Sequence, residues 1–119
     1  RVGVLTDLGH ITPHVCAAYR RCDALLVEAN HDREMLLGGS YPPHLKRRIA
    51  SSLGHLSNEQ TVALLEALGA DRPTEVIVGH ISEQNNSSKK LGQAFADVAT
   101  RLPRLSFATQ GEGFGWVDL

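Results

Sequence analysis

The chain has 119 residues, of which 42% are hydrophobic and 21% are charged, and its formal net charge is -1. This composition predicts one folded domain with a hydrophobic core and argues against a low-complexity or disordered chain. The near-zero charge gives no general attraction to nucleic acid or anionic lipid, so binding of a polyanion requires a local basic patch.

Cys16 and Cys22 do not have the spacing of a CxxC metal or redox motif, and their low number fits a reduced, cytoplasmic protein in which both are structural. No apolar run reaches the length of a membrane span and no signal peptide opens the chain, so we expect no membrane partner. The sequence begins at Arg1 and runs directly into an apolar strand, without an initiator methionine. We therefore expect a piece of a longer protein.

The first predicted element is a buried strand formed by the aliphatic residues of Val2 to Leu5. Asp7 follows this strand at its carboxyl end, which is the edge where open α/β sheets bind their ligands. Thr12 and Pro13 then have the residue types of an N-cap and of a first helical position. A lone aspartate here is more often a turn former, so its role depends on what other strands place beside it.

Strand and helix patterns alternate along the rest of the chain, which is typical of βαβ connections and a largely parallel sheet. The first of these is an amphipathic helix marked by Val15, Ala18, Tyr19 and Cys22, and a buried strand from Ala24 to Glu28 follows it. A short helix is then capped by Asp32 and ends at Leu37. The next helix is marked by Leu45, Ile49 and Leu53, and Gly54 closes it.

Later elements follow the same alternation. A capping box of Ser57 and Gln60 opens a helix that Gly69 ends, and Glu75 to Gly79 is a third strand that runs directly into His80. A long amphipathic helix follows, marked by Leu91, Ala94, Phe95, Val98 and Leu102. We expect two short edge strands at the end of the chain, Leu105 to Ala108 and Phe114 to Val117.

Three predicted strands therefore end in or just before Asp7, Glu28 and His80, and the loop before a capped helix adds His55. Aspartate oxygen and histidine nitrogen are ligands of hydrolytic zinc or manganese sites, and a glutamate beside a histidine can move a proton. Residue types and spacing leave two interpretations open. The four residues form a metal-dependent active site, or they are a satisfied set of turn residues.

Four ordered motifs resemble the second half of metallo-β-lactamase-fold hydrolases, in particular the YycJ/WalJ-type group, which is related to tRNase Z and the phosphodiesterase branch. The motifs cover nearly the whole chain and are TDLG at 6–9, LLVEANHD at 25–32, GHLSNEQ at 54–60 and VGHISEQNN at 78–86. The resemblance implies an α/β fold, with residues 1–119 forming the C-terminal half of an αββα sandwich.

The resemblance also implies roles for individual residues. Asp7 matches the aspartate that bridges two divalent metal ions, zinc or manganese, and His80 matches the last metal-binding histidine. Such a pair of ions activates water and holds a phosphodiester for in-line attack. Glu28 and His55 match a pair in which the glutamate orients the imidazole and the histidine protonates the leaving oxygen.

The family's HxHxDH motif lies upstream of the bridging aspartate and has no counterpart in this chain. Half of the sandwich and most of the metal ligands are therefore expected in a missing N-terminal half. We predict that this chain alone binds metal weakly and is inactive, whereas the intact protein is a hydrolase. Exposed apolar surface on the side of the missing half predicts that the isolated chain forms homodimers or aggregates.

Other residues are candidates for contacts with substrate or for orienting the ligands. These are Asn30, His31, Asn85 and Arg47. Arg47 belongs to the only basic cluster of the sequence, which consists of His44, Lys46, Arg47 and Arg48. The cluster is either a solvated helix face or a phosphate contact, and the resemblance favours the phosphate contact. For His31 and Asn85, a purely structural role in a turn is an equal alternative. His14 and His44 are expected to be solvated, whereas His10 stays open.

Two functional classes remain. The first is part of a metal-dependent phosphodiesterase or nuclease acting on nucleic acid or another phosphodiester; within it, a small-ester or thioester hydrolase of the same superfamily is an alternative. The second is a non-catalytic α/β module that docks on a partner. The pair Glu28 and His55 favours phosphodiesters, and an interaction module should tolerate loss of Asp7 or His80.

Overall fold

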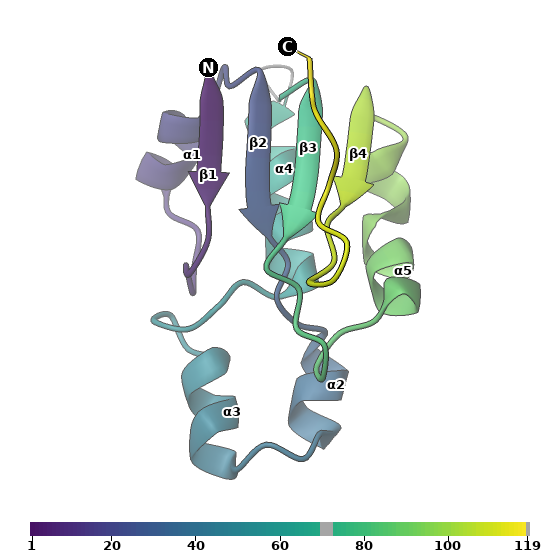
Figure 1. Ribbon diagram of the computed structural model, residues 1–119. Helices are drawn as coiled ribbons and strands as arrows, with labels where there is room; N and C mark the ends of the chain where they lie inside the picture. The colour runs from purple at the N-terminus through teal and green to yellow at the C-terminus, as the bar shows by residue number, and fades with distance from the viewer. Residues whose placement is uncertain (70–72, 119) are drawn as a thin grey trace.

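A four-stranded parallel sheet forms the centre of the computed structural model, which describes residues 1–69 and 73–118 (Figure 1). The strands lie in chain order, with each βαβ connection leading to the neighbouring position. Their bounds are β1 Val2–Leu5, β2 Ala24–Glu28, β3 Glu75–Gly79 and β4 Arg104–Phe107. The predicted α/β class with parallel strands is confirmed.

Five helices are described, and three of them, α1, α2 and α4, start at the caps that the sequence predicts. Thr12 accepts a hydrogen bond from the amide of Val15 at 3.2 Å, and Ser57 and Gln60 form the reciprocal capping box. Asp32 likewise accepts the amide of Met35 at 2.9 Å. The helices are α1 Pro13–Tyr19, α2 Arg33–Gly38, α3 Pro43–Ile49, α4 Asn58–Leu68 and α5 Ser88–Ala99.

The hydrophobic core lies between the sheet and the helices α1, α4 and α5, which share one face of the sheet (Figure 1). Because side chains alternate along a strand, Leu25 and Val27 of β2 and Val76 and Val78 of β3 all point to this side, and all four are fully buried. Phe95 of α5 packs edge-to-face on Phe107 of β4 with ring centroids 5.4 Å apart. Burial of this face fixes the register of the strands.

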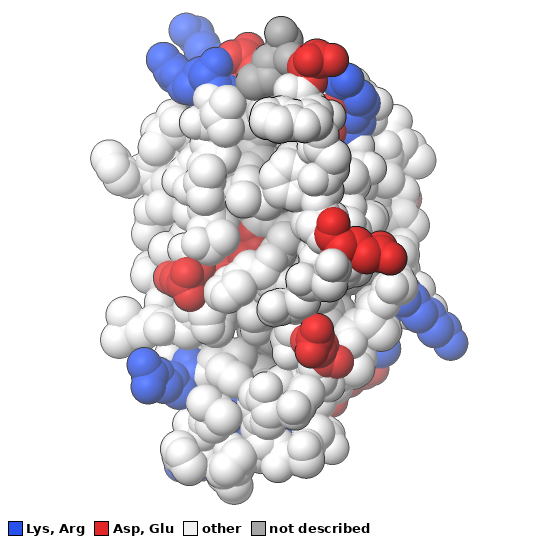
Figure 2. Space-filling model, in the orientation of Figure 1, with Lys and Arg blue, Asp and Glu red and all other residues white. Residues whose placement is uncertain are grey.

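The opposite face of the sheet is largely open. Val2 and Val4 of β1 point to this side and are 62% and 57% exposed, so the prediction of a buried first strand is wrong for these two residues. The reason is that no helix layer covers this face within the described residues, and β1 is an edge strand. Over the strands the face carries almost no charged side chains (Figure 2).

The third helix ends earlier than the sequence predicts. Its last residue is Ile49, and Gly54 is not its cap because the chain turns back at Ser51, whose hydroxyl donates to the carbonyl of Arg48 at 2.8 Å. Gly54 is required for a different reason: a Cβ at this position would lie 2.1 Å from the Ile49 carbonyl oxygen. Because Gly54 has no Cβ, the backbone can come close to Ile49, and the amide of His55 donates a hydrogen bond to the same carbonyl at 3.0 Å. Two other predicted helix stripes extend past their helices, because α1 ends before Cys22 and α5 before Leu102.

The tail contains one strand, not two. Residues 114–117 form no strand, and the segment after β4 instead crosses the open face in front of β3 (Figure 1). Glycines at 111, 113 and 115 remove the side chains that would pack on one face of a second strand. Ile77 of β3 is only 5% exposed, whereas Trp116 of the tail is fully exposed.

Two further findings concern the expectations from composition. Cys16 and Cys22 are both free thiols, half-buried and buried respectively. Among the described residues, none of the helices has the length and apolar character needed to cross a membrane.

Candidate active site

The carboxyl ends of three adjacent strands deliver the predicted site residues to one edge of the sheet. Glu28 is the last residue of β2 and pairs in register with Gly79, so His80 emerges beside it from β3. Asp7 follows β1 on the other side of β2. The strand order therefore puts Glu28 between Asp7 and His80, and the three residues meet at one edge of the sheet, as the sequence predicts.

Asp7 and His80 both have left-handed backbone conformations, with φ of 59° and 49°. This region costs non-glycine residues free energy, on the order of 1–3 kcal/mol, and it persists only where the surrounding structure holds it. Such conformations cluster at functional sites. Here they turn the two side chains out of the strand direction and toward the cavity at the strand ends.

Glu28 is fully buried and links four groups from different parts of the chain. Its Oε1 accepts the amides of Leu8 at 2.8 Å and Leu56 at 3.2 Å. Its Oε2 lies 3.1 Å from Nδ1 of His55 and 2.9 Å from Nδ1 of His80. Because a carboxylate oxygen only accepts hydrogen bonds, both imidazoles donate Nδ1–H and keep Nε2 as the nitrogen with a free lone pair.

His55 reaches the cluster from the loop between α3 and α4. Its ring stands edge-on to that of His80 with centroids 5.1 Å apart, and its Nδ1 lies 3.8 Å from an Asp7 oxygen. One ligand atom from each of Asp7, His55 and His80 lies within 4.8 Å of the others. A carboxylate with two imidazoles fits a divalent metal, and the bond from each imidazole to Glu28 is the usual way of fixing a ligating histidine.

A cavity of about 660 Å³ opens at these three residues, and it contains some of the other predicted residues. Asn30 and Asn85 line it, and the Asn30 amide donates to the carbonyl of His80 at 3.1 Å. Arg47 does not line it, nor does His31, in the part of the chain that the structure describes.

Tyr41 and Arg48 also line the cavity. The sequence placed Arg48 in the basic cluster favoured for phosphate contact but singled out Arg47 there, and it gave no role to Tyr41. Helical spacing could have found Arg48, because it lies three residues after Leu45, which lines the same cavity.

His31 lies outside this cavity, in the turn between β2 and α2. It is 1% exposed, and among the described residues its Nδ1 has no hydrogen-bond partner. Burial lowers the pKa of the His31 imidazole below its usual value, and the positive charges of nearby His55 and Arg33 lower it further. The side chain is therefore held in the neutral form.

The remaining candidates have local roles. His10 makes a 3.0 Å hydrogen bond through Nδ1 to the carbonyl of Ser52, and His14 and His44 are exposed, as expected. Asn86 donates to the carbonyl of Ala29 and exchanges reciprocal side-chain hydrogen bonds with Asn58, at 2.7 and 3.0 Å. This buried pair ties the loop after β3 to the start of α4.

Comparison with known proteins shows the family of the chain. Residues 1–81 match the family described as "Beta-lactamase superfamily domain". The chain is 44% identical over 84 residues to proteins named exodeoxyribonuclease WalJ from two strains of Streptococcus pneumoniae, D39 and R6, which covers 70% of this chain and 31% of the relative. It is 33% identical over 98 residues to a protein named exodeoxyribonuclease YycJ from Bacillus anthracis, covering 82% of this chain and 37% of the relative. The chain thus spans about a third of the length of the curated relatives it matches. No solved structure matches it significantly.

Proposed function

Since the chain belongs to the beta-lactamase superfamily, we propose that the intact protein is a metal-dependent phosphodiester hydrolase that cleaves nucleic acid. The observation that carries this proposal is the single buried carboxylate of Glu28 that bonds Nδ1 of both His55 and His80 beside Asp7. A set of ordinary turn residues has no need for two imidazoles aligned on one buried acid. The names of the relatives, exodeoxyribonucleases, support the same substrate class.

In this proposal Asp7 and His80 hold metal, zinc or manganese, and His55 acts on the substrate. Bound divalent ions supply an activated water and stabilise the charge that develops on the phosphate. Glu28 keeps the proton on Nδ1 of each ring, which fixes both ring orientations. Protonated at Nε2, His55 can then deliver a proton to the leaving oxygen, which the alcohol product requires.

We further propose that residues 1–119 are the C-terminal part of a larger domain whose upstream half carries the HxHxDH motif. The open sheet face supports this, because Val2 and Val4 would expose apolar surface there unless another layer covered it. The length of the relatives is consistent with such a layer. The remaining metal ligands would then come from that half.

The test compares this chain with a protein extended upstream of Arg1. Each is analysed for bound metal and assayed with single-stranded DNA, with bis(p-nitrophenyl) phosphate, and with a thioester. We expect two metal ions and phosphodiester cleavage in the longer protein, both lost on Asp7→Asn or His80→Ala. Thioester cleavage without phosphodiester cleavage would favour a different hydrolase of the superfamily. Absence of metal and of every activity in the longer protein would leave an interaction module.

A further inference from the structure

The cavity that holds Asp7, His55 and His80 has a second wall. This wall comes from α3 and the loops on either side of it, and α3 lies beyond the carboxyl ends of the strands (Figure 1). The volume of about 660 Å³ lies within the range of small-molecule sites, about 300–1,000 Å³. Such a volume exceeds what one phosphate group needs, so the second wall can contact parts of a substrate next to the reacting bond. The residues on it are Tyr41, Leu45, Arg48, Ile49 and Leu53.

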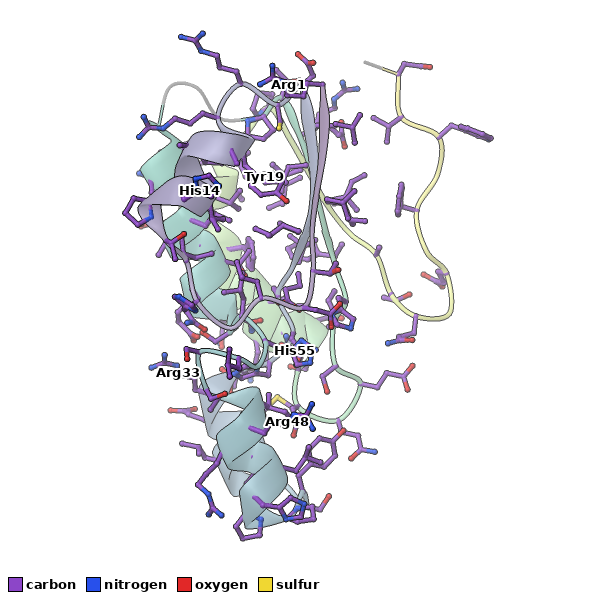
Figure 3. The ribbon with its side chains drawn as sticks, turned by 90° about the vertical axis from the view of Figure 1, so that its left-hand side faces the viewer. Arg1, His14, Tyr19, Arg33, Arg48 and His55 are labelled. Carbon is purple, nitrogen blue, oxygen red and sulfur yellow. The ribbon has the colours of Figure 1, made fainter. Side chains whose placement is uncertain are left out.

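Of the three consecutive cations on α3, only Arg48 faces the cavity. Lys46 donates through Nζ to the carbonyl of Leu37 at 2.7 Å and so holds α3 against α2. Arg47 does not line the cavity, because it is two positions from both Leu45 and Ile49 and so lies on the opposite side of the helix from these two lining residues. Figure 3 shows Arg48 extending from α3 on the side where His55 lies.

Arg48 is also the only lysine or arginine among the described residues that line this cavity. Its side chain is exposed, and no described residue forms an ion pair or hydrogen bond with its guanidinium. The same cavity carries the carboxylates of Asp7 and Glu83. A polyanion entering it therefore has one protein cation to contact, and that cation lies on a different wall from the candidate metal ligands.

Tyr41 supplies an aromatic surface to the same wall. It is half-buried in the loop before α3, where Pro42 and Pro43 follow it directly and restrict the backbone. An aromatic ring next to an arginine is the usual equipment for holding single-stranded nucleic acid, because the ring stacks on a base and the guanidinium binds a phosphate.

We propose that Tyr41 and Arg48 form a nucleotide-binding subsite for a single-stranded substrate. Arg48 binds a phosphate adjacent to the one that is cleaved, and Tyr41 stacks on the base of that nucleotide. This subsite rests on the proposed phosphodiesterase function, and it predicts that a substrate with several phosphates is preferred over a small diester that has only one.

The test measures kcat/KM of the intact, metal-loaded protein for a single-stranded deoxyoligonucleotide and for bis(p-nitrophenyl) phosphate. We expect Arg48→Ala to lower the ratio of kcat/KM for the oligonucleotide to kcat/KM for the small diester about tenfold to a hundredfold, which is the effect of losing one charge-assisted hydrogen bond. The plot of log kcat/KM for the oligonucleotide against log salt concentration has a negative slope, which should become less steep by about 0.7, as for one lost phosphate contact. Arg47→Ala is the matched control and should change neither the ratio nor the slope.

Tyr41→Ala and Tyr41→Phe test the stacking contact. We expect Tyr41→Ala to raise KM for the oligonucleotide about fivefold to a hundredfold without changing the salt slope, and Tyr41→Phe to restore the wild-type KM because the ring is kept. The subsite is refuted if Arg48→Ala leaves the ratio unchanged, slows both substrates equally, or matches Arg47→Ala. If the wild-type protein cleaves neither substrate, it is the proposed function that fails.

Discussion

Glu28 Oε2 lies 2.9 Å from His80 Nδ1, so a buried acid at the end of β2 holds a residue that follows β3. The same oxygen lies 3.1 Å from Nδ1 of His55. One carboxylate thus determines which nitrogen carries the proton in two imidazoles. The orientation of both imidazoles in the candidate site therefore depends on this acid.

Replacing Glu28 with glutamine should remove the hydrogen bonds that orient the imidazoles of His55 and His80. An amide NH₂ in place of Oε2 cannot accept Nδ1–H, so neither ring is held in its orientation, and a shift of the proton to Nε2 of His80 removes the lone pair that a metal needs. We expect metal affinity in the intact protein to fall about tenfold to a hundredfold, measured by titration calorimetry. Glu75→Gln is a matched control, since Glu75 is also a buried strand carboxylate but pairs with Arg104 at the other end of the sheet, at 2.7 Å. Equal losses in both variants would contradict the role of Glu28.

Asp7→Asn should remove activity and leave stability unchanged. The side chain of Asp7 is 68% exposed, so its loss leaves no cavity. Asparagine also tolerates the left-handed conformation at φ 59°. We expect the unfolding free energy to change by less than about 0.5 kcal/mol while metal binding and hydrolysis are lost, as measured by chemical denaturation and by activity assay. A large loss of stability would instead assign Asp7 to the turn alone.

Gly54→Ala should destabilise the protein, and Gly92→Ala should stabilise it. A Cβ at Gly54 would lie 2.1 Å from the carbonyl oxygen of Ile49 and 2.3 Å from that of Arg48, and neither backbone group can move freely. Overpacking of this kind costs about 1–3 kcal/mol. Gly92 lies inside α5, where a Cβ would meet no neighbouring atom within 4 Å, so alanine there should add about 0.4–1 kcal/mol. Thermal unfolding of both variants checks the opposite signs.

The sequence predicts the fold well where local signals and burial agree. Caps at Thr12 and Ser57 and the apolar strands β2 and β3 are examples, because side chains close in sequence determine them. It fails at Val4, whose exposure depends on what covers the sheet, and at Gly54, whose role depends on a backbone contact with the preceding helix. The strand ends predict that Asp7, Glu28 and His80 meet.

The details of the site go beyond these sequence patterns. Neither spacing nor composition shows that one oxygen of Glu28 serves both His55 and His80, because this depends on the turn geometry after β3 and before α4. Helical spacing puts Arg48 on the side of Leu45, but that this side of α3 faces the cavity depends on how the helix packs against the rest of the fold.

The burial of His31 predicts a pH dependence of stability. Its pKa is lowered from the usual 6.5 in the folded protein, so below pH 6.5 the unfolded chain binds a proton at His31 that the folded chain does not. Unfolding therefore takes up protons, and the unfolding free energy falls as the pH drops from 6.5 toward the lowered pKa, by at most about 1.4 kcal/mol per pH unit. Above this range the contribution vanishes, because His31 is neutral in both states.

Substitution of His31 with glutamine should remove this contribution while leaving those of other titrating groups in place. We expect the difference in unfolding free energy between neutral and mildly acidic pH to be smaller in His31→Gln than in the wild type, even though the substitution lowers stability at both pH values. His44→Gln is the control, because His44 is exposed on α3 and should leave the pH dependence as it is. Chemical denaturation at several pH values measures the unfolding free energy of the intact wild-type protein, of His31→Gln and of His44→Gln. An unchanged slope in His31→Gln would mean that His31 takes up a proton in the folded state despite its burial.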